Sequence, residues 1–174
     1  MICQVVVHLY ADDTTLQKSG DNLKQLEQEI NAELVVIRNW FLDNMLSLHP
    51  KKTKFMVFQT RKSRGDTSTT MEPKIENTVL QQCGVNHEEK AIKFLGLMVD
   101  ENLNWGEHVA YTETKLRKII YSINQVKKIF PIGLCIQLFK SLLMPHIDYG
   151  LLVYGNSSKI GPITKLKKLS LIHI

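Results

Sequence analysis

The sequence places two carboxylates side by side, Asp12 and Asp13, and these are the residues best suited to chemistry. Adjacent carboxylates repel each other, and that cost is tolerated at a turn that is solvated or that holds a cation. A hard divalent ion such as Mg²⁺ prefers oxygen ligands and keeps several waters, so an exposed Asp pair suits it. Asp is also a common turn former, which makes an ordinary polar turn the alternative. The pair by itself leaves both interpretations open.

The residues around the pair predict the element that presents it. The preceding segment VVVHLY, residues 5–10, is rich in β-branched and apolar side chains, which predicts a buried strand ending at Tyr10. After the pair, Thr14, Thr15 and Leu16 resume an extended pattern. We therefore expect a β-hairpin with the two Asp residues at its tip.

A second candidate is Lys52, in the basic segment PKKTK that leads into a strand expected from Phe55 to Gln59. A cation beside departing phosphates offsets developing negative charge and can donate a proton. The alternative is a solvated loop in which Lys51, Lys52 and Lys54 carry only solubilising charge. Residue type alone does not choose between these two interpretations.

A long helix is expected directly after the hairpin. From Leu23 to Phe41 the apolar residues recur at spacings of three and four, which predicts a helix of about 24 residues with one apolar face. Ser19 or Asp21 is the expected N-cap, and Asn44 is the expected end. We expect this apolar face to pack in the core, and we assign it no chemical role.

The rest of the chain predicts a hairpin and then helices. Two apolar runs, residues 75–80 and 91–99, flank QQCGVNHEEK and suggest a hairpin across it. Helices rich in Lys are expected to form a small bundle. Their expected ranges are residues 107–130, residues 131–144 with a stop at Pro145, and residues 160–169.

The net charge of +5 is unevenly distributed. Residues 1–50 carry three Lys or Arg against seven Asp or Glu, whereas residues 51–174 carry nineteen against ten. A basic C-terminal portion suits a polyanionic partner such as nucleic acid. Solubilising charge on helix surfaces explains the same pattern. If nucleic acid binds there, the candidate contacts are Lys115, Lys118, Lys127 and Lys128.

The cysteines and the hydropathy of the chain indicate where in the cell the protein is expected. Cys3, Cys83 and Cys135 are an odd number without metal-site spacing, which predicts reduced thiols of an intracellular protein and no disulfide framework. No run approaches the ~18 apolar residues of a membrane span. The start MICQVVVH lacks the features of a signal sequence. The expected location is inside the cell and outside the membrane.

Three stretches, taken together in their order along the chain, are more specific than any one of them alone: LYADDTTL, LSLHPKKT and FLGLMVDENLNW. They resemble the reverse transcriptases, and most of all the non-LTR (LINE-type) retrotransposon branch. The first is similar to that family's aromatic-x-Asp-Asp turn. The second resembles Leu-x-Leu-Asn-x-x-Lys-Thr, with His49 where Asn is usual. The third matches a family segment through Phe94, Leu95, Gly96, Asp100, Leu103 and Trp105.

The resemblance implies a role for each candidate in the acidic hairpin. Asp12 and Asp13 would join a third Asp, from an earlier strand, to hold two Mg²⁺ ions for nucleotidyl transfer. Tyr10 would lie near the primer end. Lys52 would protonate the pyrophosphate leaving group.

The resemblance also assigns roles to the later stretches. Phe94, Leu95 and Gly96 would belong to a strand pair that grips the primer backbone. Gly96 could serve equally for close packing alone, because a missing side chain lets either partner approach. The Lys-rich helices would be a thumb that follows the template–primer duplex.

The expected fold is α+β: a partial polymerase palm, with the YADD hairpin, a backing helix and small strands, followed by an α-helical thumb bundle. Residues 1–105 would form the C-terminal part of the palm and residues 106–168 the thumb. The last six residues, LSLIHI, coincide with a translated sequencing adaptor, which predicts a non-biological tail at 169–174.

The family's first catalytic Asp lies well upstream of the acidic turn, and none of the eleven residues before Asp12 is acidic. The resemblance therefore predicts a fragment of an RNA-directed DNA polymerase that is inactive alone. Its cofactor would be Mg²⁺, and its partners dNTPs, an RNA template, a DNA primer and the N-terminal fingers and palm of the same polyprotein. A non-catalytic nucleic-acid-binding remnant of a retroelement and a non-catalytic interaction protein stay open as alternatives.

Overall fold

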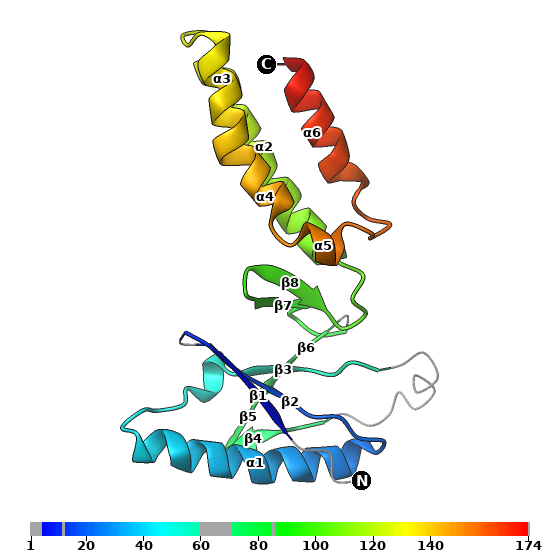
Figure 1. Ribbon diagram of the computed structural model, residues 1–174. Coiled ribbons are helices and arrows are strands. Elements are labelled where there is room, and N and C mark those ends of the chain that lie inside the picture. Colours follow the sequence, from blue (N-terminus) through cyan, green and yellow to red (C-terminus); the bar gives the residue numbers. More distant parts are fainter. Residues whose placement is uncertain (1–4, 12, 60–70, 85, 174) are drawn as a thin grey trace. The chain divides into compact units, whose positions relative to one another are not determined.

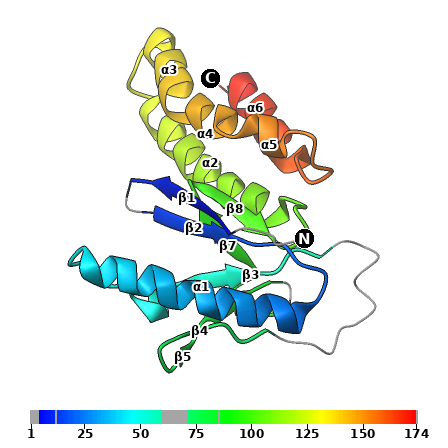
Figure 2. The ribbon, with the colours of Figure 1, turned by 60° about the horizontal axis from the view of Figure 1, so that its bottom comes forward.

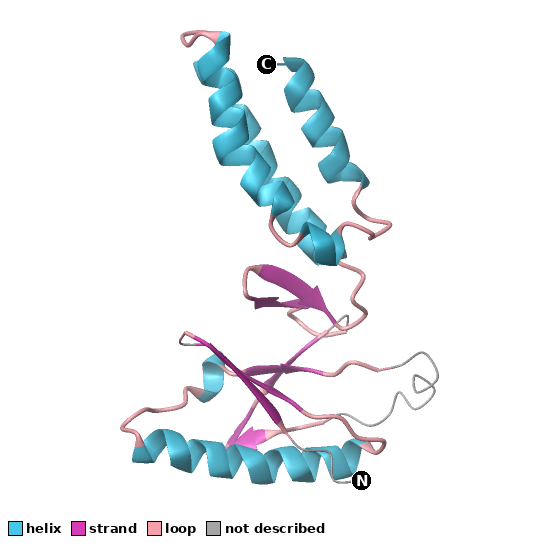
Figure 3. Cartoon of the chain, in the orientation of Figure 1, coloured by secondary structure: helices cyan, strands magenta, loops and turns pink. Residues whose placement is uncertain are grey.

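The computed structural model describes residues 5–11, 13–59, 71–84 and 86–173, with side chains up to residue 170. The chain forms two compact units, Met1–Gln82 and Cys83–Ile174, and each combines helices with small two-stranded sheets (Figure 3). This mixture agrees with the α+β prediction. The boundaries expected at residues 105 and 168 stay predictions. Within the described residues, no helix is long and apolar enough to cross a membrane.

The first element is the expected hairpin. β1 (Val6–Tyr10) and β2 (Asp13–Gln17) pair antiparallel, from Val6 opposite Gln17 to Tyr10 opposite Asp13 (Figure 2). The prediction of a buried strand is wrong, because every residue of β1 is exposed. Among the described residues, the apolar cluster of the first unit includes Leu16 of β2 and no residue of β1. β-Branched residues favour an extended backbone whether or not another layer covers them, so their pattern predicts a strand but not its burial.

α1 (Leu23–Asp43) is the predicted long helix, and it ends at Asn44 as expected. The predicted N-cap is wrong: the cap is Asn22 and not Ser19 or Asp21. The side-chain Oδ1 of Asn22 accepts hydrogen bonds from two backbone N–H groups of the first turn, at 2.9 and 3.3 Å. Asn, Asp and Ser cap helices about equally well, so residue type does not separate neighbouring candidates.

The small strands of the first unit are shorter than predicted. β3 (Lys54–Met56) pairs with β6 (Gln81–Cys83), and β4 (Lys74–Ile75) pairs with β5 (Thr78–Val79). The strand expected to reach Gln59 thus ends at Met56. The hairpin expected across QQCGVNHEEK is also wrong, because the first run pairs within the β4–β5 hairpin (residues 74–79) and the second run pairs within a separate hairpin over residues 91–100. The nearer partner closes a shorter loop, which costs less conformational entropy.

The core of the first unit forms where α1 lies along these strands (Figure 1). Leu34 of α1 is buried together with Ile75 and Leu80. The side-chain Oδ1 of Asn31 accepts a hydrogen bond from the backbone N–H of Lys74 at 2.8 Å, which fixes β4 on the helix.

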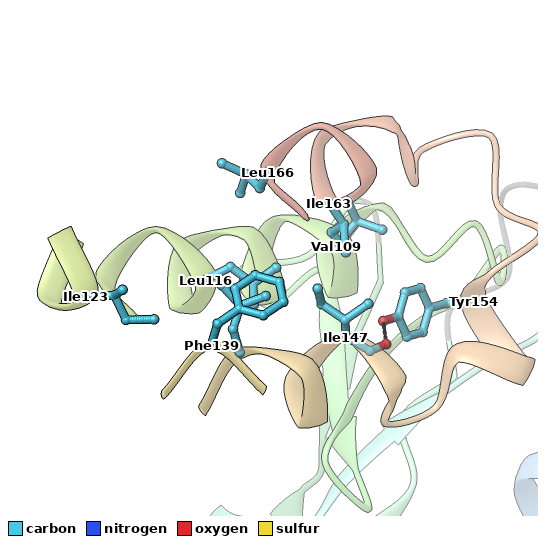
Figure 4. Packing of buried hydrophobic residues seen from close by; sticks show 9 residues of the cluster. Val109, Leu116, Ile123, Phe139, Ile147, Tyr154, Ile163 and Leu166 are labelled. Atoms are coloured by element: carbon cyan, nitrogen blue, oxygen red, sulfur yellow. Dashed lines mark hydrogen bonds between the residues drawn. The ribbon is translucent and has the colours of Figure 1, made fainter. Parts of the chain in front are cut away.

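The second unit begins with the antiparallel pair β7 (Ala91–Phe94) and β8 (Leu97–Asp100). α2 (Gly106–Val126) follows and contacts α3 (Ile132–Leu138) and α6 (Gly161–His173), so the three predicted helices are confirmed. A short α5 (Leu151–Tyr154) precedes α6. The helices enclose one apolar core (Figure 4), made of Val109, Leu116, Ile123, Phe139, Leu143, Ile147, Tyr154, Ile163 and Leu166. α6 extends four residues beyond its predicted end at residue 169, and the origin of residues 169–174 stays a prediction.

The predicted helix stop at Pro145 is wrong. The helix continues from α3 through η3 (Phe139–Leu143), which has π-helical bonding, into α4 (Met144–Asp148). Proline lacks an N–H and crowds the carbonyl four residues earlier. In η3 the N–H of Met144 donates to the carbonyl of Phe139, five residues back, so the turn is wider than an α-helical turn. This wider turn accommodates the proline within a continuous helix.

Candidate functional site

The acidic turn joins β1 to β2. Tyr10 is 67% exposed and lies opposite Asp13, whose side chain is also exposed. Asp12 lies outside the described residues. Within the described part of the chain, no group of three or more His, Cys, Asp or Glu is close enough to hold a metal. Ala11 has a left-handed φ of 52°, which costs an L-residue about 1 kcal/mol. The turn thus presents Tyr10 and Asp13 to solvent.

Lys52 lies at the end of η1 (Pro50–Lys52), a single 3₁₀ turn, and its side chain is exposed. The backbone N–H groups of Lys52 and Thr53 donate to the carbonyl of His49 at 3.0 and 3.2 Å. The Thr53 hydroxyl donates to the same carbonyl at 3.1 Å. His49 therefore supports the turn through its backbone carbonyl, which any residue type supplies.

Phe94, Leu95 and Gly96 form the turn between β7 and β8. Leu95 (φ 45°) and Gly96 (φ 86°) both have positive φ, as the favoured two-residue hairpin loops require. The hydroxyl of Tyr149 donates a hydrogen bond to the carbonyl of Leu95. A Cβ at position 96 would lie 3.1 Å from Tyr149 Cε1. The backbone conformation and the packing of Tyr149 thus both favour glycine at position 96.

Asp100, the buried acid of the same segment, organises the connection to α2. Its Oδ1 accepts hydrogen bonds from the backbone N–H groups of Asn102 and Asn104, both at 3.1 Å. Its Oδ2 accepts one from the N–H of Trp105 at 2.9 Å. Leu103 and Trp105 have positive φ values of 53° and 63°, so the loop needs this support. The sequence gives no sign of this role, because Asp100 lies six residues before the start of α2 and the N-cap position of the helix is Trp105.

His108 is a buried histidine for which no pattern in the sequence predicts a role. Its Nδ1 accepts a hydrogen bond from the Met98 N–H at 3.3 Å, and its Nε2 lies 3.4 Å from the Thr112 hydroxyl. Burial, and then the nearby charge of Lys115, lower the pKa of His108. Because Nδ1 accepts a hydrogen bond, the ring is neutral in this arrangement. His108 therefore joins β8 to α2 without adding charge.

A pocket of about 190 Å³ lies in the second unit between the β7–β8 turn and the helices. Gly96 and Lys115, both predicted site residues, line it together. Lys93, Tyr111 and Tyr149, for which the sequence predicts no role, line it too. Tyr111 and Lys115 are four residues apart on α2, a spacing that places two side chains on one helix face and could have indicated the pair.

The four lysines predicted to contact nucleic acid do not share one surface. Lys115 is half-buried in the pocket wall, whereas Lys118, one turn along α2, is exposed. Lys127 and Lys128 follow the last residue of α2 and are exposed. At about 100° per residue, Lys127 lies about 120° around the helix axis from Lys115. The charges are therefore spread around α2.

Two known proteins are similar to this chain over most of its length. The RNA-directed DNA polymerase from mobile element jockey of Drosophila melanogaster is 22% identical over 159 residues, which are 89% of this chain. The Pol polyprotein from type-1 retrotransposable element R1 2 of Nasonia vitripennis is 22% identical over 122 residues, 70% of this chain. The predicted resemblance to the non-LTR retrotransposon polymerases is confirmed. No family model and no solved structure matches the chain.

The chain spans 16% of the length of the jockey polymerase and 28% of the R1 polyprotein. The residues suggested by the resemblance to these retrotransposon polymerases fall in both units. Tyr10, Asp13 and Lys52 belong to the first unit, and the Phe94–Gly96 turn and the α2 lysines belong to the second. The structure pairs Tyr10 with Asp13, and it brings Gly96 and Lys115 to one pocket.

Proposed function

We propose that the chain is part of the RNA-directed DNA polymerase of a non-LTR retrotransposon, which adds dNTPs to a primer 3′ end on an RNA template. The observation that carries this proposal is the similarity to the jockey polymerase over 89% of the chain. Residues 1–105 are then part of the palm, and residues 106–168 are the thumb. The partners are the RNA template, the DNA primer, dNTPs and the N-terminal part of the same polyprotein, inside the cell.

In this proposal Asp12 and Asp13 hold Mg²⁺ at the tip of the β1–β2 hairpin, with a third carboxylate from the N-terminal part. The exposed carboxylate of Asp13 suits a hard cation that keeps some of its waters. When bound, two Mg²⁺ ions supply activation of the primer 3′ oxygen and charge stabilisation of the pyrophosphate. Tyr10, opposite Asp13, lies beside the primer end, and Lys52 donates a proton to the leaving pyrophosphate.

Mn²⁺, which takes the same oxygen ligands as Mg²⁺, is expected to bind at the hairpin tip. Its paramagnetism should broaden the amide NMR signals of residues 10–14 before those of other residues. Asp13→Asn is expected to weaken this binding about fivefold, because one exposed charge contributes about 1 kcal/mol. Asp21→Asn, which removes an exposed carboxylate outside the hairpin, is the matched control. Equal broadening in both variants would show that the turn is no metal site.

The 174-residue chain by itself is not expected to extend a primer, because it supplies two of the three carboxylates that the proposed mechanism uses. The measurement is incorporation of labelled dNTP on a primed RNA template with Mg²⁺. Asp12→Asn is the background control. Incorporation clearly above that background would contradict the expected inactivity while supporting the polymerase function itself.

A non-catalytic nucleic-acid-binding remnant is the second candidate, and the charge distribution favours it. Residues 83–174 carry twelve Lys or Arg against seven Asp or Glu, whereas residues 1–82 carry ten of each. The whole excess of +5 therefore lies in the second unit. Such a protein neutralises phosphates and needs no metal, so Mn²⁺ binding at the hairpin distinguishes the two candidates.

A further inference from the structure

We infer that the pocket in the second unit is a binding site for one phosphate group. The pocket measures about 190 Å³ and lies where the β7–β8 turn meets α2 and α4. Its lining includes two cationic side chains, Lys93 and Lys115, and two phenols, Tyr111 and Tyr149. The described residues that line it include no Asp or Glu. The pocket therefore offers positive charge and no competing carboxylate to an anion.

Both lysines line the pocket beside one phenol, Tyr111. The Nζ of Lys115 lies 4.6 Å from the centre of the Tyr111 ring. A hydrogen bond with Lys115, and then the charges of Lys115 and Lys93, lower the pKa of the Tyr111 hydroxyl. Within the described residues, neither lysine forms an ion pair. Two like charges that line one small pocket repel each other, and an anion bound between them lowers that cost.

Two other polar side chains of the pocket already have hydrogen-bond partners, so its positive charge comes from the lysines. His108 also lines the pocket, but its ring is neutral and both of its nitrogens have partners in β8 and α2. The Tyr149 hydroxyl already donates to the carbonyl of Leu95. His146 of α4 is exposed and adds a second imidazole at the rim.

A phosphate group fits this arrangement better than a carboxylate does. Lys93 comes from β7 and Lys115 from α2, so the two cations approach from different elements. A tetrahedral phosphate presents oxygens in several directions, whereas a carboxylate presents two in one plane. Lysine binds phosphate as a point charge and needs no fixed fork geometry. The shared ligand chemistry is a phosphate oxyanion, from a nucleic-acid backbone or from a free phosphate ester.

The first test titrates the ¹⁵N-labelled full chain with inorganic phosphate, with NaCl adjusted to keep the ionic strength constant. The amide signals of residues 93–97 and 111–115 are expected to shift in a saturable way. Lys115→Gln is expected to weaken this binding about tenfold, since a hydrogen bond to a charged group is lost. Lys93→Gln, at an exposed strand position, is a second variant that tests the same pocket.

Lys140→Gln is the matched control, because Lys140 is an exposed lysine of the same unit, does not line the pocket and is not a predicted nucleic-acid contact. It is expected to bind phosphate as the unsubstituted chain does, and unchanged signals of the second unit away from the pocket report that each variant is folded. The absence of a saturable shift would overturn the inference. The same loss of affinity in Lys140→Gln as in Lys115→Gln would overturn it too.

A second arm identifies the source of the phosphate, using the fluorescence anisotropy of a short labelled RNA–DNA duplex. If Lys115→Gln weakens duplex binding more than Lys140→Gln does, the pocket takes a backbone phosphate. If the two variants bind the duplex equally while only Lys115→Gln loses inorganic phosphate, the ligand is a free phosphate ester. Both results support the pocket. Neither depends on the acidic hairpin, so failure of the Mn²⁺ experiment leaves this inference intact.

Discussion

Replacing Asp100 with Ala is expected to lower the free energy of unfolding of the second unit by about 3 kcal/mol. The side chain of Asp100 is buried, and it accepts three backbone hydrogen bonds in the loop before α2. Alanine would leave those N–H groups without their acceptor, at about 1 kcal/mol or more each. The same loop holds Leu103 and Trp105 at positive φ, a conformation that the carboxylate stabilises.

The measurement is urea unfolding followed by Trp105 fluorescence in a Trp40→Phe background. The chain has two tryptophans, and only Trp105 lies in the second unit. Glu88→Ala removes an exposed carboxylate of the same unit, and we expect it to change stability by less than about 0.5 kcal/mol. Asp100→Asn keeps one acceptor oxygen and should fall between the two. Equal midpoints for Asp100→Ala and Glu88→Ala would refute the role of the carboxylate.

The sequence predicts elements where one pattern runs over many residues, but it does not predict their surroundings. The apolar stripe of α1 and the β-branched run of β1 specify a helix and a strand. The burial of β1 depends on what packs against it, and the sequence of the strand does not specify that partner. Pro145 shows the same limit, because a local rule predicts a helix end and the π turn in η3 overrides the rule.

The residues of the candidate site also fall into two groups, those that are consecutive in the sequence and those that only the fold brings together. The acidic pair and the Phe94–Gly96 turn can be recognised because each is a run of consecutive residues. The pocket cannot be recognised, because Lys93, Lys115 and Tyr149 come from a strand, a helix and the end of another helix. The role of Asp100 is invisible for another reason. Its place in a motif says nothing about which backbone groups its oxygens accept from.

Gly96→Val is expected to cost the second unit about 3 kcal/mol, in the absence of any nucleic acid. Gly96 has a φ of 86°, and a β-branched residue in that region is a genuine outlier. A Cβ there would lie 3.1 Å from Tyr149 Cε1, so the tyrosine ring would have to shift. That shift would weaken the hydrogen bond from the Tyr149 hydroxyl to the carbonyl of Leu95.

Gly133→Ala supplies the contrasting control for this substitution. Gly133 lies in α3, and a Cβ at that position would meet nothing within 4 Å. Ala should therefore not destabilise the unit, and because Gly133 lies in the first turn of α3 its gain should be at most the usual ~0.5–1 kcal/mol over Gly in a helix interior. Urea unfolding in the Trp40→Phe background measures both variants. If Gly96→Val unfolds at the same urea concentration as the parent, glycine at this turn is not needed for packing, and a close approach by a nucleic-acid backbone becomes the better explanation. If Gly96→Val loses the expected stability, the contact between the turn and Tyr149 is sufficient to explain glycine at this position.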